Sequence, residues 1–596
     1  MKLFEAHMNP YVRISATGQA SSRIISLMNR LLFTVGSVCL AAFVSIEARQ
    51  VRQVDDAMLL KPPDGEWITY GRDQAETHHS PLRQIDQSNV ARLGLAWSTE
   101  VGSDGKIETT PLVFDGVLYG TSTWSAVYAV DLRTGKLKWK WDPGLVRAGY
   151  EADGPRACCG PVNRGVALYK GRVYVGLLDG RLVALNAETG MPEWAVQTTP
   201  PGTDYTITGA PRVIKGRVVI GQGGAEYGVR GFLAGYDAAT GKLAWKFYTV
   251  PGDPKKGFED EALARAAKTW AGEWWKAGGG GTPWDGIAYD PELNLIYVGT
   301  GNGSPWNAQH RSPGGGDNLY LSSIVALNAG TGKYVWHYQT TPGDNWDLNA
   351  AQPMILADIR FGNTVRKVIM QAPKNGFFYV LDRTDGKLIS GDAFAYASWA
   401  TGIDMKTGRP METEAARYRY NPVRLSPSPV GAHHWPPMAY NPATGLVYYP
   451  GQETSMVVAM EEKFEYQEGR WNLGMRMGTR PGADGKPGPA PPPDPKAPPM
   501  TGFFVAWDPV LKKAAWRLQF QPSGGALSTA GQLIFVGNSS GKLFALHPAD
   551  GKTLWEAQMM PGVATPVTYE LDGRQYVAVM SGQNKGKIFA FTLDAK

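Results

Sequence analysis

The chain has 596 residues, which on length alone corresponds to about three or four average domains unless it folds as one large repeat structure. The composition favours a repeat, because 72 Gly, 43 Pro and 20 Trp with only 19% charged residues are typical of many short strands and tight turns rather than of a long helical protein. The net charge of +6 is scattered along the chain, so it offers little support for nucleic-acid binding.

Residues 1–48 have the layout of a secretory signal. Arg23 and Arg30 precede an apolar run over 31–44, and polar sequence follows that run. The run is shorter than the roughly 20 residues that a membrane-spanning helix needs. We therefore expect export to the periplasm, with an uncleaved membrane anchor as the alternative. Removal of this leader would also remove Cys39 and leave two cysteines in an oxidising compartment.

One phrase recurs along the chain: a small residue, an apolar residue, Asp or Asn, a few polar residues, Thr-Gly-Lys and then Trp. Its copies end at Trp139, Trp194, Trp245 and Trp336, and more degenerate copies end at Trp516 and Trp555. Each copy predicts a strand, a turn that contains Gly, and a second strand that begins with the Trp.

Another strand pair precedes each copy of the phrase, and four strands every 40 to 55 residues or so indicate a β-propeller. Trp97 marks an earlier unit, so the count comes to about eight. We therefore predict an all-β fold, a single eight-bladed β-propeller over residues 64–596, in which each Trp docks between neighbouring sheets. Two insertions interrupt it: residues 258–277 have a helical composition, and residues 479–500 form a Pro-rich loop.

Cys158 and Cys159 are adjacent in the sequence. A relaxed disulfide has Cα atoms roughly 5.5 to 6 Å apart, whereas neighbours on a trans peptide are held at about 3.8 Å. Joining them would close a strained eight-membered ring, and such strain usually marks a functional site. On the dipeptide alone, two free thiols or thiols that pair with another chain remain open alternatives.

Five glycine-rich turns carry polar or aromatic residues that the propeller itself does not require. These residues are Glu226, Trp284, Asn302, Asp347 and Lys374. Glycine lets the backbone come close to a ligand. Each residue alone has a structural explanation, such as an ion pair between Glu226 and Arg230 or a turn held by Asn302. Their joint occurrence favours a binding or catalytic site.

From about Asp64 to its end, the chain resembles the quinoprotein alcohol dehydrogenases. The resemblance rests on long segments, among them CCGPVNRGVAL, GAPRVIKGRVVIGQGGAEYGVRGF, GNGSPWN, TTPGDNWD and QAPKNGFFYVLDRTDGKLIS. It is closest to the propeller part of the quinohaemoprotein alcohol dehydrogenases. The resemblance implies an eight-bladed propeller that carries pyrroloquinoline quinone (PQQ) and calcium on its central axis.

Carried over residue by residue, the resemblance implies a disulfide ring of Cys158 and Cys159 over one face of the quinone and the indole of Trp284 over the other. Further residues match positions that hold the quinone at its edge: Glu108, Arg164, Thr208, Gly224, Ala225, Lys374 and His434. Arg164 can bind a carboxylate through two N–H groups, which suits a tricarboxylic cofactor.

Glu226, Asn302 and Asp347 match the metal-binding positions of the family, an oxygen-rich set that suits calcium. Lanthanide-using relatives have a further Asp where this chain has Asn349. The implied catalytic residues are Asp347, which would remove the alcohol proton while a hydride moves to C5 of the quinone, and Lys374, which with calcium would polarise the carbonyl there.

Three residues depart from the family pattern. Gly160 follows the cysteine pair where an acidic residue is common, His434 stands where relatives usually have Asn, and Gln583 stands where many have an aromatic residue beside the substrate. We interpret His434 as a neutral hydrogen-bonding substitute for Asn, with a new proton-transfer role as the alternative. These departures leave the identity of the alcohol open.

The haem-bearing relatives continue into a domain with a Cys-x-x-Cys-His motif, which this sequence lacks. We therefore expect electrons to pass to a separate, soluble c-type cytochrome. One alternative function is a non-catalytic propeller scaffold of the outer-membrane assembly type, but such a scaffold does not need the cysteine pair or Asp347. A propeller hydrolase or sugar dehydrogenase is a second alternative, which would lack the adjacent cysteines and the GDNWD turn.

Overall fold

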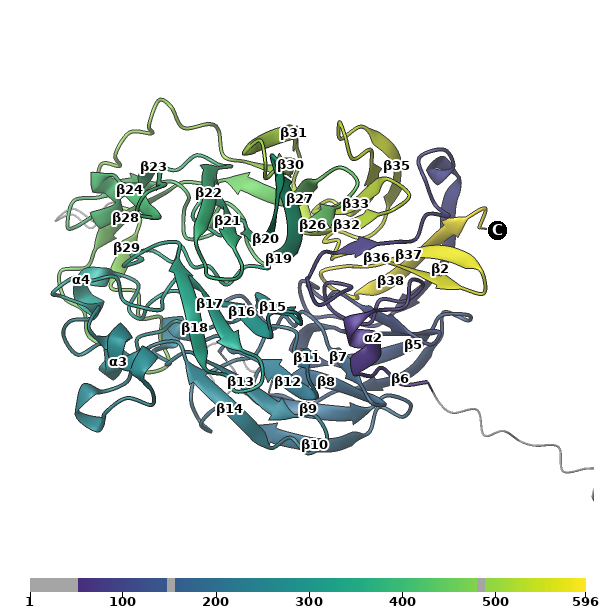
Figure 1. Ribbon diagram of the computed structural model, residues 1–596, viewed down its shortest axis with the longest axis horizontal. Helices are drawn as coiled ribbons and strands as arrows, with labels where there is room; N and C mark the ends of the chain where they lie inside the picture. Colours follow the sequence, from purple (N-terminus) through teal and green to yellow (C-terminus); the bar gives the residue numbers. More distant parts are fainter. Residues whose placement is uncertain (1–51, 147–155, 480–487, 596) are drawn as a thin grey trace, which may run out of the picture. The chain divides into compact units, whose positions relative to one another are not determined.

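The computed structural model describes residues 52–146, 156–479 and 488–595. The leader predicted over residues 1–48, with Cys39, lies outside the described residues. Residues 53–596 form a unit with its own core, and its antiparallel sheets follow one another in chain order (Figure 1).

Most of these sheets contain four strands. The first three are β3–β6 (Leu112–Phe114, Val117–Thr121, Val127–Asp131 and Leu137–Trp141), β7–β10 (Ala167–Tyr169, Arg172–Gly176, Arg181–Asn186 and Pro192–Gln197) and β11–β14 (Arg212–Ile214, Arg217–Ile220, Phe232–Asp237 and Leu243–Tyr248). The next three are β15–β18 (Ile287–Asp290, Leu295–Gly299, Ser323–Asn328 and Tyr334–Gln339), β19–β22 (Ile355–Phe361, Thr364–Gln371, Phe377–Asp382 and Leu388–Ala393) and β26, β27, β30 and β31 (Ala439–Asn441, Leu446–Glu453, Thr501–Asp508 and Lys513–Gln519). The following sheet is β32–β35 (Pro522–Thr529, Leu533–Asn538, Lys542–Leu546 and Thr553–Gln558), to which β1 (His79–Ser80) adds in parallel beside β32.

The last sheet joins the two ends of this unit. Strand β2 (Leu93–Glu100) pairs with β38 (Lys587–Leu593). Strand β38 also pairs with β37 (Arg574–Ser581), and β37 pairs with β36 (Val567–Leu571). Leu93 lies opposite Leu593 and Glu100 opposite Lys587. This pairing satisfies an edge that would otherwise be exposed. The all-β prediction is confirmed.

Several of the repeated tryptophans pack against the glycine of the corresponding turn in the next sheet. A Cβ added at Gly190, whose φ is +73°, would lie 2.6 Å from the Trp139 ring. The same packing recurs in later pairs of sheets: Trp194 with Gly241, Trp245 with Gly332, and Trp336 with Gly386. Only glycine tolerates both the positive φ and the close ring. The predicted docking of these tryptophans between sheets is confirmed, and it explains why Gly and Trp recur together.

The segments outside the large sheets are short. Helix α3 (Glu261–Ala267) and the 3₁₀ helix η5 (Trp274–Ala277) lie within the segment 258–277, where the sequence predicts a helix. Strands β23 and β24 (Ala400–Asp404 and Arg409–Glu412) form one small sheet, and β25, β28 and β29 (Val423–Leu425, Met456–Met460 and Met475–Met477) form another. The described part of the Pro-rich segment before Thr501 contains no helix or strand.

The remaining helical elements are α2 (Asp56–Leu60), α4 (Ala308–Arg311), η1 (Val90–Arg92), η2 (Thr123–Ser125), η3 (Ala225–Tyr227), η4 (Pro254–Lys256) and η6 (Glu414–Arg417). Within the described ranges, every helix is too short or too polar to cross a bilayer.

Candidate active site

Turns from consecutive sheets meet around one narrow cavity of about 70 Å³. Most of the residues predicted for the site line it: Cys158, Cys159, Arg164, Thr208, Gly224, Glu226, Trp284, Asn302, Asp347, Lys374 and His434. A wider cavity of about 360 Å³ shares Cys159, Arg164 and His434 with it. The structure therefore brings together residues that the sequence distributes over several repeats.

Two predicted residues lie just outside the narrow cavity. Glu108 lines the wider one and forms an ion pair with Arg164, at 2.8 Å between Oε2 and Nη2. Ala225 is fully buried in η3, where it directly precedes Glu226 in the sequence. Neither Gly160 nor Gln583 is among the residues that line the two cavities.

Asp347 is held by two short hydrogen bonds at the bottom of a buried turn. Lys374 Nζ donates to its Oδ2 at 2.6 Å, and Asn349 Nδ2 donates to its Oδ1 at 2.6 Å. Lys374 donates a further hydrogen bond to the carbonyl of Pro429 at 2.9 Å. The backbone of Asp347 has a φ of +70°, a conformation that non-glycine residues adopt at a cost and that often occurs at functional sites.

Burial controls the ionisation of this pair. Burial raises the pKa of Asp347 to about 7, the Lys374 ammonium opposes that rise, and the Glu226 carboxylate adds to it. Burial lowers the pKa of Lys374, but the adjacent Asp347 carboxylate outweighs this, so the pKa lies above its usual value. Lys374 therefore stays charged, and Asp347 can gain or lose a proton near neutral pH.

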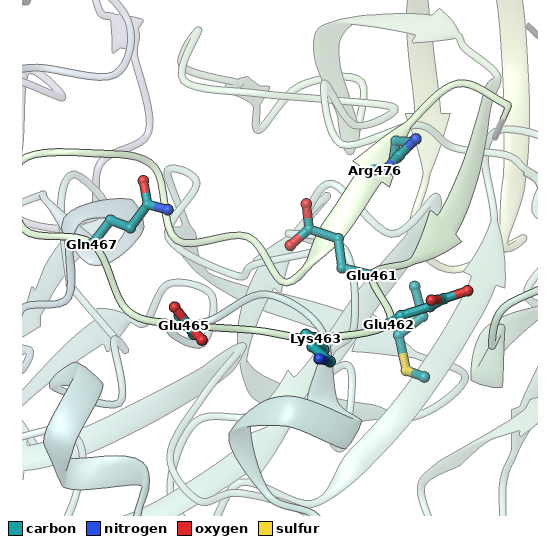
Figure 2. A pocket seen from close by; sticks show the side chains of 7 residues that line it. Glu461, Glu462, Lys463, Glu465, Gln467 and Arg476 are labelled. Carbon is teal, nitrogen blue, oxygen red and sulfur yellow. The ribbon is translucent and has the colours of Figure 1, made fainter. Parts of the chain in front are cut away.

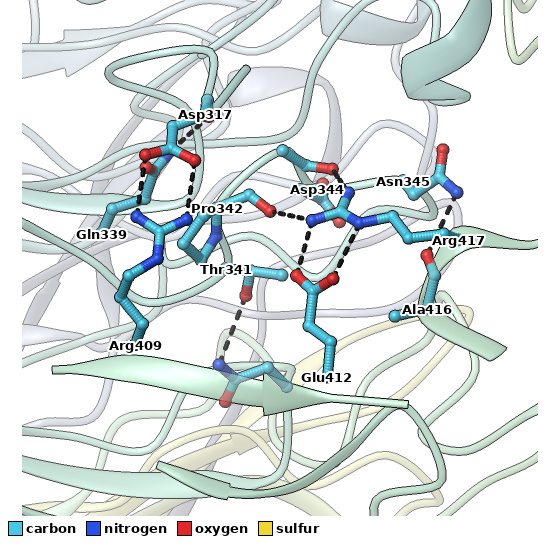
Figure 3. Close-up of polar contacts among 12 residues, drawn as sticks. Asp317, Gln339, Thr341, Pro342, Asp344, Asn345, Arg409, Glu412, Ala416 and Arg417 are labelled. Atoms are coloured by element: carbon cyan, nitrogen blue, oxygen red, sulfur yellow. Dashed lines mark hydrogen bonds and ion pairs between the residues drawn. The ribbon is translucent and has the colours of Figure 1, made fainter. Parts of the chain in front are cut away.

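Arg417 binds the backbone a few residues before Asp347 (Figure 3). Arg417 donates to the carbonyls of Gly343 at 2.6 Å and Pro342 at 2.9 Å. Glu412 accepts two hydrogen bonds from the same guanidinium, at 2.8 and 2.5 Å. These contacts restrain the backbone on the amino-terminal side of Asp347.

Glu226, Asn302 and Asp347 supply oxygen atoms to the same cavity. Asn302 donates its amide N–H to the carbonyl of Gly303 at 3.3 Å, and amide oxygens are typical calcium ligands. Within the described part of the chain, no group of three or more His, Cys, Asp or Glu side chains could hold a metal ion, so a cation in this cavity would also need the amide oxygen of Asn302. Two carboxylates and an amide fit a hard cation such as calcium better than a transition metal.

Arg164 is buried with incomplete hydrogen bonding. Its Nη1 donates to Thr208 Oγ1 at 2.8 Å, and its guanidinium lies 5.1 Å from the ring centre of Trp284. Among the described residues, its Nε and both carboxylate oxygens of Asp285 lack a hydrogen-bond partner, although Nε and Asp285 Oδ2 are 3.8 Å apart. A buried cation with an unused donor fits a ligand that carries carboxylates.

Cys158 and Cys159 lie at the cavity wall as free cysteines, with 2.7 Å between the two sulfurs. The hydrogen bond between them raises the pKa of the Cys158 thiol and lowers that of Cys159. The proposed disulfide ring therefore stays a prediction.

His434 stacks on Trp284, with 5.4 Å between the ring centres and 25° between the planes. Burial lowers the pKa of His434 well below its usual value, and the nearby charges of Lys374 and Arg164 act in the same direction. His434 is therefore neutral, which agrees with its interpretation as a hydrogen-bonding substitute for Asn.

Sequence reasoning missed Asp285, which follows Trp284 directly and lies 3.8 Å from Arg164. Burial raises the pKa of Asp285 to about 6, and Arg164 opposes the rise. The signal was present in the turn GGGGTPWDG, where the acid stands beside the predicted stacking residue. Thr206 and Thr282 also line the cavity, and no distinctive pattern marks them.

Comparison with known proteins identifies the family. The model of the PQQ glucose, ethanol and alcohol dehydrogenase β-propeller domain matches residues 67–391 and 504–577. The chain belongs to this family. The β-propeller fold and the resemblance to quinoprotein alcohol dehydrogenases are confirmed, while the count of eight blades stays a prediction.

Close relatives and solved structures agree with this assignment. Quinohemoprotein alcohol dehydrogenase ADH IIB of Pseudomonas putida is 50% identical over 567 residues, which cover 91% of this chain and 80% of the relative. The 1-butanol dehydrogenase (cytochrome c) of Thauera butanivorans is 45% identical over 541 residues, 87% of this chain and 74% of the relative. The crystal structure of quinohemoprotein alcohol dehydrogenase from Comamonas testosteroni superposes with a TM-score of 0.83 at 48% identity, covering 89% of this chain and 81% of that one.

Proposed function

We propose that this chain oxidises an alcohol to an aldehyde or ketone in the periplasm, with PQQ as cofactor and calcium as its metal ion. The observation that carries the proposal is the single cavity that unites Asp347 and Lys374 with Glu226, Asn302 and Trp284. When bound, the quinone would accept the hydride equivalent, and so the two electrons, of the alcohol at its C5 carbon.

In this proposal Asp347 is the general base. Its carboxylate would take the proton from the alcohol hydroxyl, and the hydrogen bonds from Lys374 and Asn349 hold both of its oxygens in place. Lys374 is charged and touches Asp347 at 2.6 Å, so it can also donate to a carbonyl oxygen beside it. A bound cation would favour the ionised form of Asp347 and so keep the base available.

Glu226, Asn302 and Asp347 would hold the calcium ion, which would supply Lewis acidity next to the base. Asn349 supports calcium over a lanthanide, because it donates a hydrogen bond to Asp347 and does not add a third carboxylate.

Arg164, with Glu108 and Thr208, would hold the cofactor by its carboxylates. The unused Nε of Arg164 supports this role. Trp284 would cover one face of the cofactor and the cysteine pair the other, while Gly224, Ala225 and His434 would meet its edge. Gly224 has a φ of +111°, and a Cβ there would lie 2.3 Å from the carbonyl oxygen of Asp204, so only glycine fits this turn.

We propose a separate, soluble c-type cytochrome as the electron acceptor. The name of the 1-butanol dehydrogenase relative, which includes cytochrome c, supports this class of acceptor. The alternative of a non-catalytic scaffold is not favoured, because a scaffold has no use for a cavity that gathers two carboxylates, a lysine and an incompletely bonded arginine.

Reconstitution tests the proposal. The purified chain, loaded with calcium and PQQ, should reduce an artificial dye when an alcohol from a panel of primary, secondary and polymeric alcohols is added. Asp347→Asn should lower turnover by about 10²- to 10⁴-fold, because it removes the base but keeps the shape of the side chain. The melting temperature of the variant serves as the folding control. No turnover with demonstrably bound cofactor would reject the enzyme, and full activity of the variant would reject Asp347 as the base.

A further inference from the structure

The connection between β28 and β29, residues 461–474, contains no helix or strand of its own and is long for a hairpin connection. We call it the strap. On its outer side, Glu461, Glu462, Lys463, Glu465 and Gln467 line an open cavity of about 680 Å³, together with Arg476 and Met460 (Figure 2). None of the residues predicted for the active site lines that cavity. Long connections without secondary structure in compact domains are usually functional or disordered, and the contacts of the strap favour the first.

The carboxyl-terminal part of the strap is bonded to the turn that carries Glu226. The backbone N–H of Asn472 donates to the carbonyl of Glu226 itself, at 2.7 Å. Two other strap residues bond Tyr227, which follows Glu226. Tyr466 Oη donates to the carbonyl of Tyr227 at 3.0 Å, and Trp471 Nε1 donates to Tyr227 Oη at 2.9 Å. The backbone around one proposed calcium ligand is therefore held by the strap.

The ends of the strap also reach the segment that follows Asn302, at Asn307 and helix α4. The carbonyl of Leu473 accepts a hydrogen bond from the backbone N–H of Asn307 at 2.9 Å. The carbonyl of Glu461 lies 2.9 Å from Nε2 of His310, whose ring is 5.7 Å from that of Phe464. One segment thus bonds the backbone of Glu226 directly and bridges it to Asn307 and His310, five and eight residues after Asn302.

Asn472 makes the strap rigid enough to act in this way. Its side chain is 2% exposed and closes a loop within the strap: Oδ1 accepts from the backbone N–H of Gln467 at 2.8 Å, and Nδ2 donates to the carbonyls of Gln467 and Arg470 at 3.0 and 2.8 Å. The same residue therefore shapes the loop through its side chain and bonds Glu226 through its backbone.

We propose that the strap is a positioning element of the cation site and that Asn472 is the positioning residue that sets the affinity of this site for calcium. The inference rests on the proposed function, because it assigns the cation to Glu226, Asn302 and Asp347. Residues behind metal ligands typically change metal affinity by about 10- to 100-fold when they are removed. By linkage, a cation that binds the two bridged loops must also stabilise the strap.

Calorimetric titration of the full chain with calcium, in the presence of bound PQQ, measures the calcium affinity of the cation site. Asn472→Ala should weaken calcium binding by about tenfold or more. Trp471→Phe keeps an aromatic side chain but removes the indole N–H that donates to Tyr227, so it should weaken binding by a smaller factor. The matched control is Asn186→Ala: Asn186 also makes several side-chain hydrogen bonds within a turn, to Glu188, Thr189 and Glu193, but contacts no proposed ligand. Its calcium affinity should equal that of the wild type.

Hydrogen exchange of the wild-type chain measures the reciprocal effect and does not depend on any variant folding. Added calcium should slow amide exchange in the peptide that contains residues 464–474, and it should leave the turn at Asn186 unchanged. Unaltered exchange in the strap, or equal calcium affinity of Asn472→Ala and wild type, would overturn the inference while the proposed function stands. No calcium binding by the wild type would overturn both.

Discussion

Two buried arginines in neighbouring parts of the chain differ in how completely they are bonded. Arg212 uses all of its donor nitrogens: Nε and Nη2 donate to the Glu76 carboxylate at 2.6 and 3.0 Å, and Nη1 donates to the carbonyl of Ala210 at 2.8 Å. Its guanidinium also lies 4.1 Å from the ring centre of Tyr70. Arg164 forms an ion pair with Glu108 and donates a hydrogen bond to Thr208, but its Nε has no hydrogen-bond partner among the described residues.

The difference separates a structural cluster from a binding site. A buried charged group that makes a hydrogen bond from every donor nitrogen mainly holds its surroundings together. A buried charged group with an unused donor destabilises the folded chain, and a ligand that accepts a hydrogen bond from this donor can offset that loss. We therefore assign Arg212 to the fold and Arg164 to the cofactor, and each assignment predicts a different result on substitution.

Arg212→Met should strongly destabilise the fold. It leaves the Glu76 carboxylate buried without a partner, and breaking one side of a buried ion pair typically costs about 3 to 5 kcal/mol. The free energy of unfolding from denaturant titration measures this loss. The double variant with Glu76→Gln should recover much of the loss, because it removes the stranded charge. A change in PQQ affinity without a change in stability would contradict the assignment.

Arg164→Met should mainly weaken cofactor binding, by about 10- to 100-fold, because charge-assisted hydrogen bonds to the cofactor are lost. The loss of stability should be smaller than for Arg212→Met, since the contact of Arg164 with Asp285 is long, at 3.8 Å, and Lys106 lies 3.6 Å from Glu108 and can still compensate its charge. Fluorescence titration with PQQ gives the affinity, and thermal unfolding of the cofactor-free chain gives the stability. If both variants lost the same stability and neither lost affinity, the two clusters would not differ in role.

The repeat was predictable from the sequence because each copy depends on residues that lie close together in the chain. A Thr-Gly turn and the following Trp recur at similar spacing, and the packing of each Trp on the next glycine follows from one rule applied repeatedly. The cavity residues were predictable for another reason: Glu226, Trp284, Asn302, Asp347 and Lys374 lie in glycine-rich turns, and the family resemblance supplied most of the others.

The unpredicted features depend on contacts between distant segments. Trp471 and Tyr227 are 244 residues apart, and nothing in the spacing of either segment indicates that the strap reaches the Glu226 turn. The segment 258–277 does contain a short α-helix, Glu261–Ala267, but the sequence does not show that Trp270 and Trp274 pack into a small cluster with Val250 and Leu321. The unused Nε of Arg164 could not be predicted either, because its partners Glu108 and Thr208 come from other segments of the chain.

His78 belongs to the Arg212 cluster and makes stability depend on pH. Burial, assisted by the Arg212 charge, lowers the pKa of His78 from 6.5 to about 3. The folded state therefore keeps His78 neutral while the unfolded chain takes up a proton below pH 6.5, so the free energy of unfolding should fall as the pH drops from about 6.5 towards 3. For one proton the slope is about 1.4 kcal/mol per pH unit. His78→Gln should remove this component from a series of denaturant titrations, and an unchanged slope would contradict it.

The cysteine pair should behave as part of the site and contribute little to the fold. A disulfide between adjacent residues closes almost no loop, so it restricts the unfolded chain very little. Mild reduction followed by thiol blocking should therefore lower activity and PQQ affinity while the melting temperature shifts by only about 1 or 2 °C, in contrast to Arg212→Met. Thiol titration of the native, cofactor-free protein checks that Cys158 and Cys159 were oxidised at the start. Reduced and blocked protein with full activity and PQQ affinity would mean that the pair does not cover the cofactor.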